Sequence, residues 1–142
     1  MPSSAPDFET FDHTADVGLI ARGATLEDVF VNAARGLFHI IAGDARIEPT
    51  RRLEVEVTAP DREALLVAWL NELIFHFETT HLVFAAFEIG ALTDERLTAT
   101  IAGLPMDELD EPLEMELKAA TYHGLAVRVT DAGWEAEVLF DV

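Results

Sequence analysis

The chain has 142 residues and a mass of 15.6 kDa, which is enough for one domain with a sizeable core. It contains no cysteine, which excludes a disulfide scaffold, a thiolate zinc site and a cysteine nucleophile. Its 27 acidic residues and 9 Lys and Arg give a formal net charge of -18, which disfavours tight direct binding to nucleic acid or to an anionic membrane. A basic protein partner or bound cations would suit this charge, and so would plain solubility.

The first half of the chain predicts two short strands, a helix and a third strand. Thr25 followed by two acidic residues is typical of a helix N-cap, and Gly43 is a suitable stop. Apolar residues recur at helical spacing between them. The predicted strands are Phe8–Asp12, Val17–Arg22 and the alternating segment Leu53–Val57.

The second half predicts one long helix and then a run of strands. The helix begins at Pro60-Asp61, carries a wide apolar stripe and ends at Thr79–His81. The strands expected after it are Val83–Ile89, Arg96–Ala102, Glu116–Tyr122 and a final hairpin of Leu125–Thr130 with Trp134–Asp141. The sum is an α+β fold with a mostly antiparallel mixed β-sheet and two packed helices.

One domain, residues 8–142, is expected to follow a flexible tip over residues 1–7. The N-terminus has neither a basic nor an apolar region of the kind found in signal peptides. The most apolar stretch is too short to span a bilayer. We therefore expect a cytoplasmic protein without membrane association.

The segment Asp12-His13-Thr14-Ala15-Asp16-Val17-Gly18 is a dense polar cluster just before a predicted strand. Two carboxylates around an imidazole suggest an oxygen-rich metal site or an acid–base pair. A turn capped by Asp and Thr side chains, with Gly18 allowing close packing, explains the same residues and is favoured locally.

The last residues, Phe140-Asp141-Val142, add weight to the metal site. An apolar strand that finishes on Asp141, one residue before the α-carboxylate, places two carboxyl groups close together. If that strand lies near the one that follows Asp16, three carboxylates converge, and a hard cation such as calcium or magnesium would relieve their repulsion. A solvated chain end is the structural alternative.

Two further clusters stand out. Lys118-Ala119-Ala120-Thr121-Tyr122-His123-Gly124 gathers the only lysine and the only tyrosine beside a histidine, so it could bind phosphate, or simply end a strand. Asp107–Glu116 holds six acids in ten residues. Such a run is usually a solvated loop, and a docking surface for a basic partner is the alternative.

Taken together, these blocks resemble the archease family. The resemblance rests on Phe11–Gly18, on Leu66–Phe75 with Trp69-Leu70-Asn71-Glu72-Leu73, on the Lys118–His123 block and on the terminal Phe140-Asp141-Val142, and it runs from about residue 8 to the last residue. The resemblance implies a fold with a strand–helix–strand–strand module. One departure is that Leu104 follows Gly103, where archeases commonly carry a Gly-Glu pair.

The resemblance also implies a function. Archeases are accessory proteins of the RtcB-type RNA-splicing ligase; they promote its GTP-dependent guanylylation and its repeated turnover in tRNA splicing and RNA repair, and are not the ligase themselves. The family binds a divalent cation, often calcium, with magnesium and manganese as alternatives. Carried over by position, the metal ligands are Asp16, Asp141 and Val142. Residues expected at the activating or partner-contacting surface are Asp12, His13, Lys118, Tyr122 and His123, with GTP as a candidate ligand of the shared site.

Two other classes of function compete with this interpretation. The first is a metal-dependent phosphoesterase or nucleotide hydrolase that uses Asp16, Asp141 and either His13 or His123. The chain offers such an enzyme no nucleophile beyond a metal-bound water and few basic groups to bind phosphate. The second is a general chaperone-like binding module, which would suppress aggregation of unrelated proteins without affecting a ligase.

Overall fold

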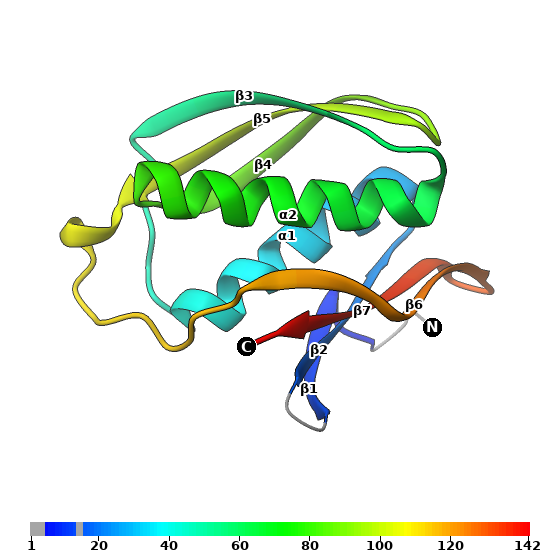
Figure 1. Cartoon of the computed structure of the whole chain (residues 1–142), viewed down its shortest axis with the longest axis horizontal. Coiled ribbons are helices and arrows are strands. Elements are labelled where there is room, and N and C mark those ends of the chain that lie inside the picture. The colour runs from blue at the N-terminus through cyan, green and yellow to red at the C-terminus, as the bar shows by residue number, and fades with distance from the viewer. Residues whose placement is uncertain (1–4, 14–15) are drawn as a thin grey trace.

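The computed structural model describes residues 5–13 and 16–142 of the chain. Seven strands, two long helices and one short 3-10 helix follow one another in the described part (Figure 1). In chain order they are β1 (Phe8–His13), β2 (Asp16–Gly23), α1 (Leu26–Ala42), β3 (Arg51–Thr58), α2 (Arg62–Thr80), β4 (Leu82–Leu92), β5 (Arg96–Pro105), η1 (Met106–Glu108), β6 (Ala119–Thr130) and β7 (Gly133–Asp141).

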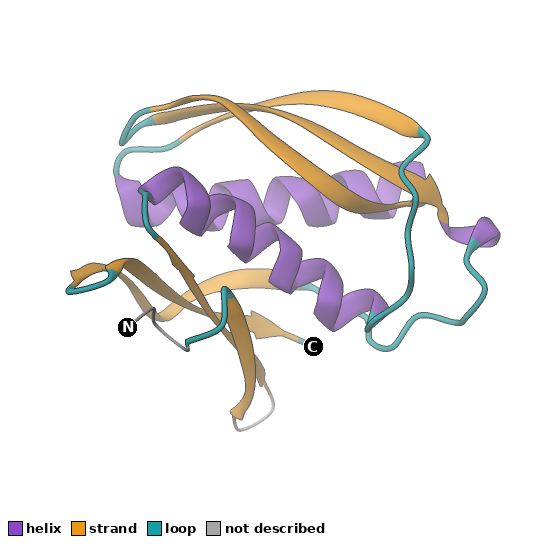
Figure 2. Cartoon of the chain, turned by 180° about the vertical axis from the view of Figure 1, so that it is seen from behind, coloured by secondary structure: helices purple, strands orange, loops and turns teal. Residues whose placement is uncertain are grey.

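The strands form two sheets with the two helices between them (Figure 2). One sheet has the order β1-β2-β7-β6 and the other β3-β5-β4, and neighbouring strands in both are antiparallel. The predicted α+β class is confirmed, but the strands divide between two sheets where the sequence pattern predicted one. Helix α1 is buried on most of its circumference, so a single sheet could not have covered its apolar residues.

Both helices begin and end where the sequence predicts. The Thr25 hydroxyl accepts a hydrogen bond from the Asp28 amide at 3.1 Å, and the Asp28 carboxylate accepts one from the Thr25 amide at 3.3 Å. Helix α1 stops at Gly43, whose φ of 65° suits a residue without Cβ. Asp61 caps α2, which ends at His81 in a left-handed conformation. The side-chain caps satisfy backbone amides in the first turn and fix where each helix begins.

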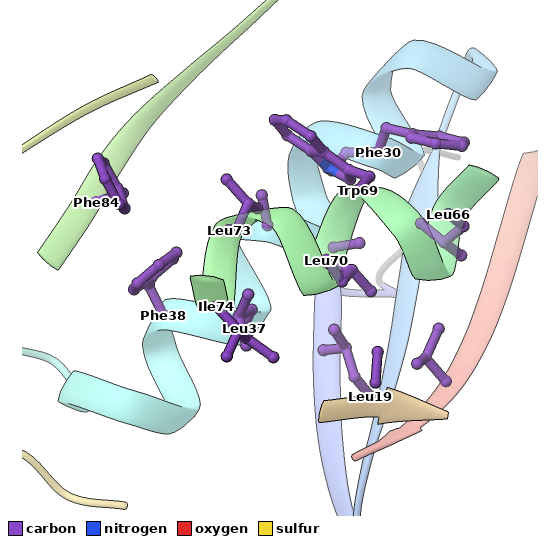
Figure 3. Packing of buried hydrophobic residues seen from close by; sticks show 14 of the residues in the cluster. Leu19, Phe30, Leu37, Phe38, Leu66, Trp69, Leu70, Leu73, Ile74 and Phe84 are labelled. Atoms are coloured by element: carbon purple, nitrogen blue, oxygen red, sulfur yellow. The ribbon is translucent and has the colours of Figure 1, made fainter. Parts of the chain in front are cut away.

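The core lies where α1 and α2 meet the inner faces of the two sheets (Figure 3). Trp69 of α2 is fully buried, and its indole N–H donates to the Phe30 carbonyl of α1 at 3.0 Å. Leu19 of β2 and Phe84 of β4 reach this core from opposite sheets. The helix pair therefore ties the sheets together, and the outer face of each sheet remains available for other roles.

Strand β6 differs from its prediction. The sequence predicts two strands, Glu116–Tyr122 and Leu125–Thr130, whereas the structure has one strand, Ala119–Thr130, with an irregularity between Thr121 and Ala126 in its pairing with β7. Gly124, with φ of 65°, supplies the backbone conformation that such a bulge needs. The two predicted pieces are thus the two halves of one bulged strand, which pairs with β7 in the predicted hairpin.

Two expectations concern the chain as a whole, the flexible N-terminal tip and the lack of membrane association. Of the predicted flexible tip, residues 1–4 lie outside the described part, so that expectation stays a prediction. Within the tip, the Asp7 carbonyl accepts a hydrogen bond from the Arg22 amide at 2.7 Å. None of the helices in the described ranges is both long and apolar enough to cross a membrane.

Candidate metal centre

Antiparallel pairing of β2 with β7 places Asp16 directly opposite Asp141. The two residues are 125 positions apart in the chain, and they meet because β2 begins where β7 ends. Side chains directly opposite each other in an antiparallel pair share one face, with their Cβ atoms about 4.5–5.5 Å apart. The two strands are therefore neighbours, as the expected convergence requires, and two of its three carboxylates belong to directly opposed residues.

Two histidines extend this pair across the sheet. His13 lies opposite Asp16 in the pairing of β1 with β2, and its Nδ1 atom is 3.6 Å from an Asp16 carboxylate oxygen. The ring of His123, from the irregular part of β6, has its centroid 6.0 Å from that of His13. We call the set His13, Asp16, Asp141 and His123 the carboxylate–histidine row. Thr14 and Ala15, which belong to the predicted cluster, lie outside the described residues.

The inner face of the same strands holds the row in place. Val17 and Phe140, the neighbours of the two aspartates, are both buried and lie opposite each other. Alternation along a strand then turns Asp16 and Asp141 to the outer face. On that face the Phe11 ring lies over Gly18 so closely that a Cβ there would be 2.1 Å from the ring. The proposed role of Gly18 in close packing is confirmed, and it lies two residues from Asp16.

The backbone of the lysine block is joined to the same strand end. The Lys118 amide donates to the Asp141 carbonyl at 2.9 Å, and Ala119 lies opposite Asp141. Asn71 of α2 holds this segment from behind: its side chain accepts from the Ala120 amide at 2.8 Å and donates to the Ala120 carbonyl at 3.2 Å.

Sequence reasoning missed the role of Asn71. In the sequence, Asn71 enters only as part of the Leu66–Phe75 block of the resemblance, with no role of its own. The signal was present, however, because an amide among the core-facing residues of a helix needs a polar partner when it is buried. Asn71 finds that partner in the backbone of the strand that carries the lysine block. It is thus a positioning residue for the strand beside Asp141.

The other residues predicted for the site lie near the carboxylate–histidine row but do not belong to it. Asp12 lies opposite Val17. Because it directly precedes His13 in the strand, its side chain is on the other face. Tyr122 is exposed on the bulge of β6, with 64% of its surface accessible, and Lys118 is exposed just before β6. Val142 follows Asp141 and is 45% exposed.

The donor set suits a hard divalent cation. Asp16 and Asp141 supply carboxylate oxygens, which calcium and magnesium prefer. In residues 5–13 and 16–142, no Arg or Lys forms an ion pair with either aspartate. The same ranges contain no group of three or more His, Cys, Asp and Glu side chains arranged to hold a metal ion. Val142, the expected third ligand, would contribute a main-chain oxygen, which is not one of these side-chain groups.

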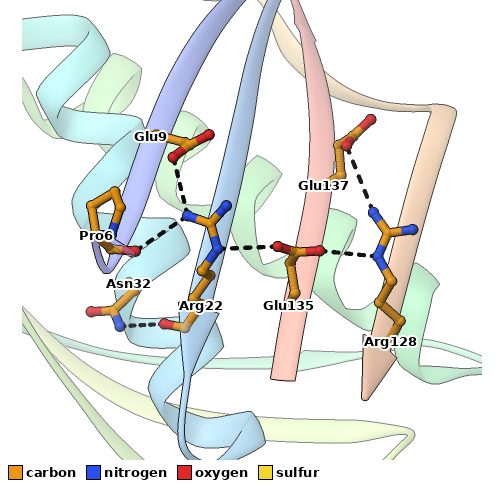
Figure 4. A network of polar contacts seen from close by, with 7 residues as sticks. All are labelled: Pro6, Glu9, Arg22, Asn32, Arg128, Glu135 and Glu137. Atoms are coloured by element: carbon orange, nitrogen blue, oxygen red, sulfur yellow. Dashed lines mark hydrogen bonds and ion pairs between the residues drawn. The ribbon is translucent and has the colours of Figure 1, made fainter. Parts of the chain in front are cut away.

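The opposite end of the same outer face carries a ladder of ion pairs (Figure 4). Arg22 Nε lies 3.1 Å from one oxygen of Glu135, and Arg128 Nε lies 3.1 Å from the other. Burial is the largest single influence on the pKa of Arg22 and lowers it, but the hydrogen bonds and negative charges of Glu9 and Glu135 together raise that pKa above its ordinary value. Arg22 therefore stays charged, and the ladder is a structural feature of the sheet.

Comparisons with known proteins agree with this description. Residues 8–142 match the model of the archease protein family (MTH1598/TM1083). The chain is 38% identical to a protein archease of Methanosarcina mazei, over 100% of both chains, and 36% identical to a protein archease of Methanothermobacter thermautotrophicus, over 95% of this chain and 98% of that one. The chain belongs to the archease family.

Solved structures show the same fold. The solution structure of protein 1598 of Methanobacterium thermoautotrophicum has a TM-score of 0.79 and 35% identity, and the match covers 96% of this chain and 99% of that one. The crystal structure of an archease and possible chaperone from Thermotoga maritima has a TM-score of 0.64 at 19% identity, over 100% of this chain and 99% of that one. The second likeness concerns the fold alone.

Proposed function

We propose that this chain is a non-enzymatic accessory protein that activates an RtcB-type RNA-splicing ligase in the cytoplasm, promoting its GTP-dependent guanylylation and its repeated turnover. The observation that carries the proposal is the direct opposition of Asp16 and Asp141 at one end of the outer sheet face. Membership of the archease family supports an accessory role.

The proposed working part is a divalent cation held by Asp16, Asp141 and an oxygen of Val142. Calcium is the first candidate, and magnesium and manganese are the alternatives. A bound cation would supply a positive centre able to attract phosphate oxygens, GTP included. The two aspartates are directly opposite each other on neighbouring strands, and the buried Val17 and Phe140 beside them hold the strand ends together.

The residues around the aspartates form the proposed contact surface for the ligase. His13 comes from β1, and Tyr122 and His123 come from the bulge of β6, so the surface is made of two separate segments. Asp12 is the neighbour of His13 in β1, with its side chain on the other face of that strand. Lys118 lies beside them on the backbone that binds Asp141. The Nδ1 atom of His13 lies 3.6 Å from an Asp16 carboxylate oxygen, and the His13 ring centroid is 6.0 Å from that of His123, so the two segments meet beside the aspartates.

Overall charge supports a protein partner over direct RNA binding. The net charge of -18 repels the phosphate backbone, whereas an RNA-binding ligase must present basic surfaces that an acidic protein can approach. In this arrangement the ligase holds the RNA and performs the chemistry.

The test is multiple-turnover RNA ligation by the RtcB-type ligase from the same source, with GTP and metal, and with this protein at a substoichiometric concentration. We expect more turnovers per ligase with the unaltered protein and no increase with Asp16→Asn or Asp141→Asn. Asp131→Asn is the matched control, because Asp131 is an exposed aspartate in the turn at the other end of the same hairpin.

Two results would contradict the proposal. If Asp16→Asn activates as well as Asp131→Asn does, the aspartate pair has no part in activation. If the purified protein hydrolyses GTP or phosphate esters without the ligase, it is an enzyme in its own right, and the same variants would then show whether the aspartate pair carries that activity.

A further inference from the structure

A concave surface lies between the end of α2 and the long acidic segment that connects β5 to β6. Figure 1 shows this segment leaving η1, passing the ends of both helices and returning to β6. The hollow has a volume of about 460 Å³, within the usual range of ligand pockets. We call it the methionine groove, and its lining residues are Phe77, Glu78, His81, Met106, Leu113, Glu114, Met115 and Glu116. None of them belongs to the carboxylate–histidine row.

The walls of the methionine groove are held by backbone hydrogen bonds to the ends of both helices. The Met106 amide donates to the His81 carbonyl at 2.8 Å, where α2 ends. The Glu114 and Met115 amides donate to the Ile41 carbonyl at 2.8 and 3.3 Å, near the end of α1. The segment is therefore fixed on both sides of the groove, so a ligand would not have to order it on binding.

The floor is apolar and incompletely covered. Phe77 and Leu113 are partly buried and pack against the core. Met106 and Met115, at 37% and 38% exposure, are two of the few large hydrophobic residues that the described part leaves exposed. Methionine side chains are flexible and polarisable, and they are used on surfaces that accept apolar groups of varied shape. Apolar side chains gathered in a fixed hollow point to a binding surface.

Charge decides which kind of partner fits. Glu78, Glu114 and Glu116 line the groove and are exposed, and four more acids lie between Met106 and Leu113. Nucleic acid and anionic membranes would be repelled. A second copy of this chain, also carrying a net charge of -18, would bring like charges together. A positively charged protein segment with an apolar side chain is complementary to both the apolar floor and the acidic edge of the groove.

We infer that the methionine groove binds a protein segment in which one large aliphatic side chain is flanked by Lys and Arg. The aliphatic side chain would contact Met106 and Met115, while the basic residues would pair with the glutamates at the edge. This inference goes beyond ligase activation, because it requires neither the metal site nor a ligase. It also gives the acidic run Asp107–Glu116 a role in binding, in addition to solubility.

The test uses three synthetic peptides of equal length. The first has a central Leu between Lys and Arg residues, the second has Ser in place of Leu, and the third has Glu in place of every Lys and Arg. Binding is measured by fluorescence anisotropy at two salt concentrations. The protein is also labelled at the methionine methyl groups, whose NMR signals are assigned by substitution. We expect only the first peptide to bind well, binding to weaken in high salt, and the Met106 and Met115 methyl signals to shift.

Substitutions then separate the apolar and the charged contributions. Met115→Ser should weaken binding of the first peptide about tenfold, because it removes an apolar contact. Val129→Ser is the matched control: Val129 is 68% exposed on β6, is not part of the groove, and its replacement should leave binding unchanged. Replacing Glu114 and Glu116 together by Gln should reduce the salt dependence. All these side chains are exposed, so the variants should fold, which circular dichroism verifies.

Several results would overturn the inference. One is the absence of binding at about 1 mM peptide, where even weak recognition is detected. Another is equal binding of the three peptides, or binding that leaves the Met106 and Met115 signals in place. A third is self-association of the free protein that Met115→Ser abolishes, since the groove would then be covered by a second copy. The metal-site variants Asp16→Asn and Asp141→Asn should bind the first peptide normally, which keeps this test independent of the proposed function.

Discussion

The two ends of the outer face of the β1-β2-β7-β6 sheet carry different arrangements of charge. At one end, Arg22 lies between Glu9 and Glu135, and Arg128 lies between Glu135 and Glu137, so charges of opposite sign alternate across the strands. At the other end, Asp16 and Asp141 face each other. Among the described residues, the imidazole of His13 is the only basic side chain within ion-pair distance of either aspartate.

This difference distinguishes a structural arrangement from a candidate site within a single sheet. Like charges directly opposite each other destabilise a strand pair, whereas opposite charges stabilise it. The ladder around Arg22 therefore contributes to folding without a ligand. The Asp16–Asp141 pair costs stability unless a cation or a partner compensates it. The predictions that follow exploit this contrast, in order of decreasing effect.

Leu19→Ala should have the largest effect on stability. Leu19 lies in the middle of β2, between the two ends, and is almost fully buried against the helices. Its truncation should lower the free energy of unfolding by about 3 kcal/mol, as measured by urea denaturation. The response to calcium and the ion-pair ladder should persist in the folded variant, because the inner face carries the fold and the outer face carries the charges. A change below 1 kcal/mol would mean that the sheet is not anchored in this way.

Calcium should stabilise the unaltered protein and not the variant lacking one aspartate. Ligand at 100 times its Kd adds about 2.7 kcal/mol to the free energy of unfolding, which raises the melting temperature. Asp16→Asn should lose this response, and chelation by EDTA should remove it from the unaltered protein. Asp131→Asn should keep the full response. An equal response in both variants would exclude Asp16 from the cation site.

Glu135→Gln should lower stability by about 1 kcal/mol, with or without calcium. Glu135 is the shared acceptor of Arg22 and Arg128. The Glu135 and Arg22 side chains are 22% and 26% exposed, so solvent screens their contact less than it screens a fully exposed pair. Asp94→Asn is the matched control, because the Arg62–Asp94 pair is more exposed and its loss should cost less. A double-mutant cycle of Glu135 with Arg22 measures the coupling directly. Equal effects of the two substitutions would show that the ladder is no stronger than an isolated surface pair.

Asp141→Asn should have the smallest effect on the free energy of unfolding, and it should stabilise the protein where the other substitutions destabilise it. Without calcium, removing one of two opposed negative charges should raise the free energy of unfolding by a few tenths of a kcal/mol. Chemical denaturation in EDTA, repeated at low and high salt, checks this, since salt should shrink the gain. Destabilisation at low salt would mean that repulsion between the two aspartates is not significant.

Much of the secondary structure was predictable because it depends on local signals. Thr25 with Asp28, Gly43 and Asp61 mark helix ends through hydrogen bonds to residues a few positions away. The β6–β7 hairpin likewise follows from a short turn, with φ of 133° at Gly133. The division of strands into two sheets was not predictable, since alternation shows that a strand has one buried face and not which element covers that face.

The candidate site lies between these cases. Its residues were chosen from the sequence, through the composition of two short segments and the resemblance to archeases. Whether Asp16 and Asp141 meet depended on the pairing of β2 with β7, and the placement of Asp12 on the other face depended on the register of β1. Asn71 illustrates what local patterns omit, because its two partners belong to the backbone of a strand 49 residues away.

The sequence by itself determined the α+β class, the helix limits, the final hairpin, the family resemblance and the strong negative charge. These features follow from composition and from interactions between residues close together in the chain. Only the tertiary structure decided that the strands form two sheets, that the two aspartates are opposed and that two methionines line an acidic groove. Those features depend on contacts between distant segments, which form where buried surfaces fit together. Short-range sequence patterns do not specify which surfaces will pack against each other.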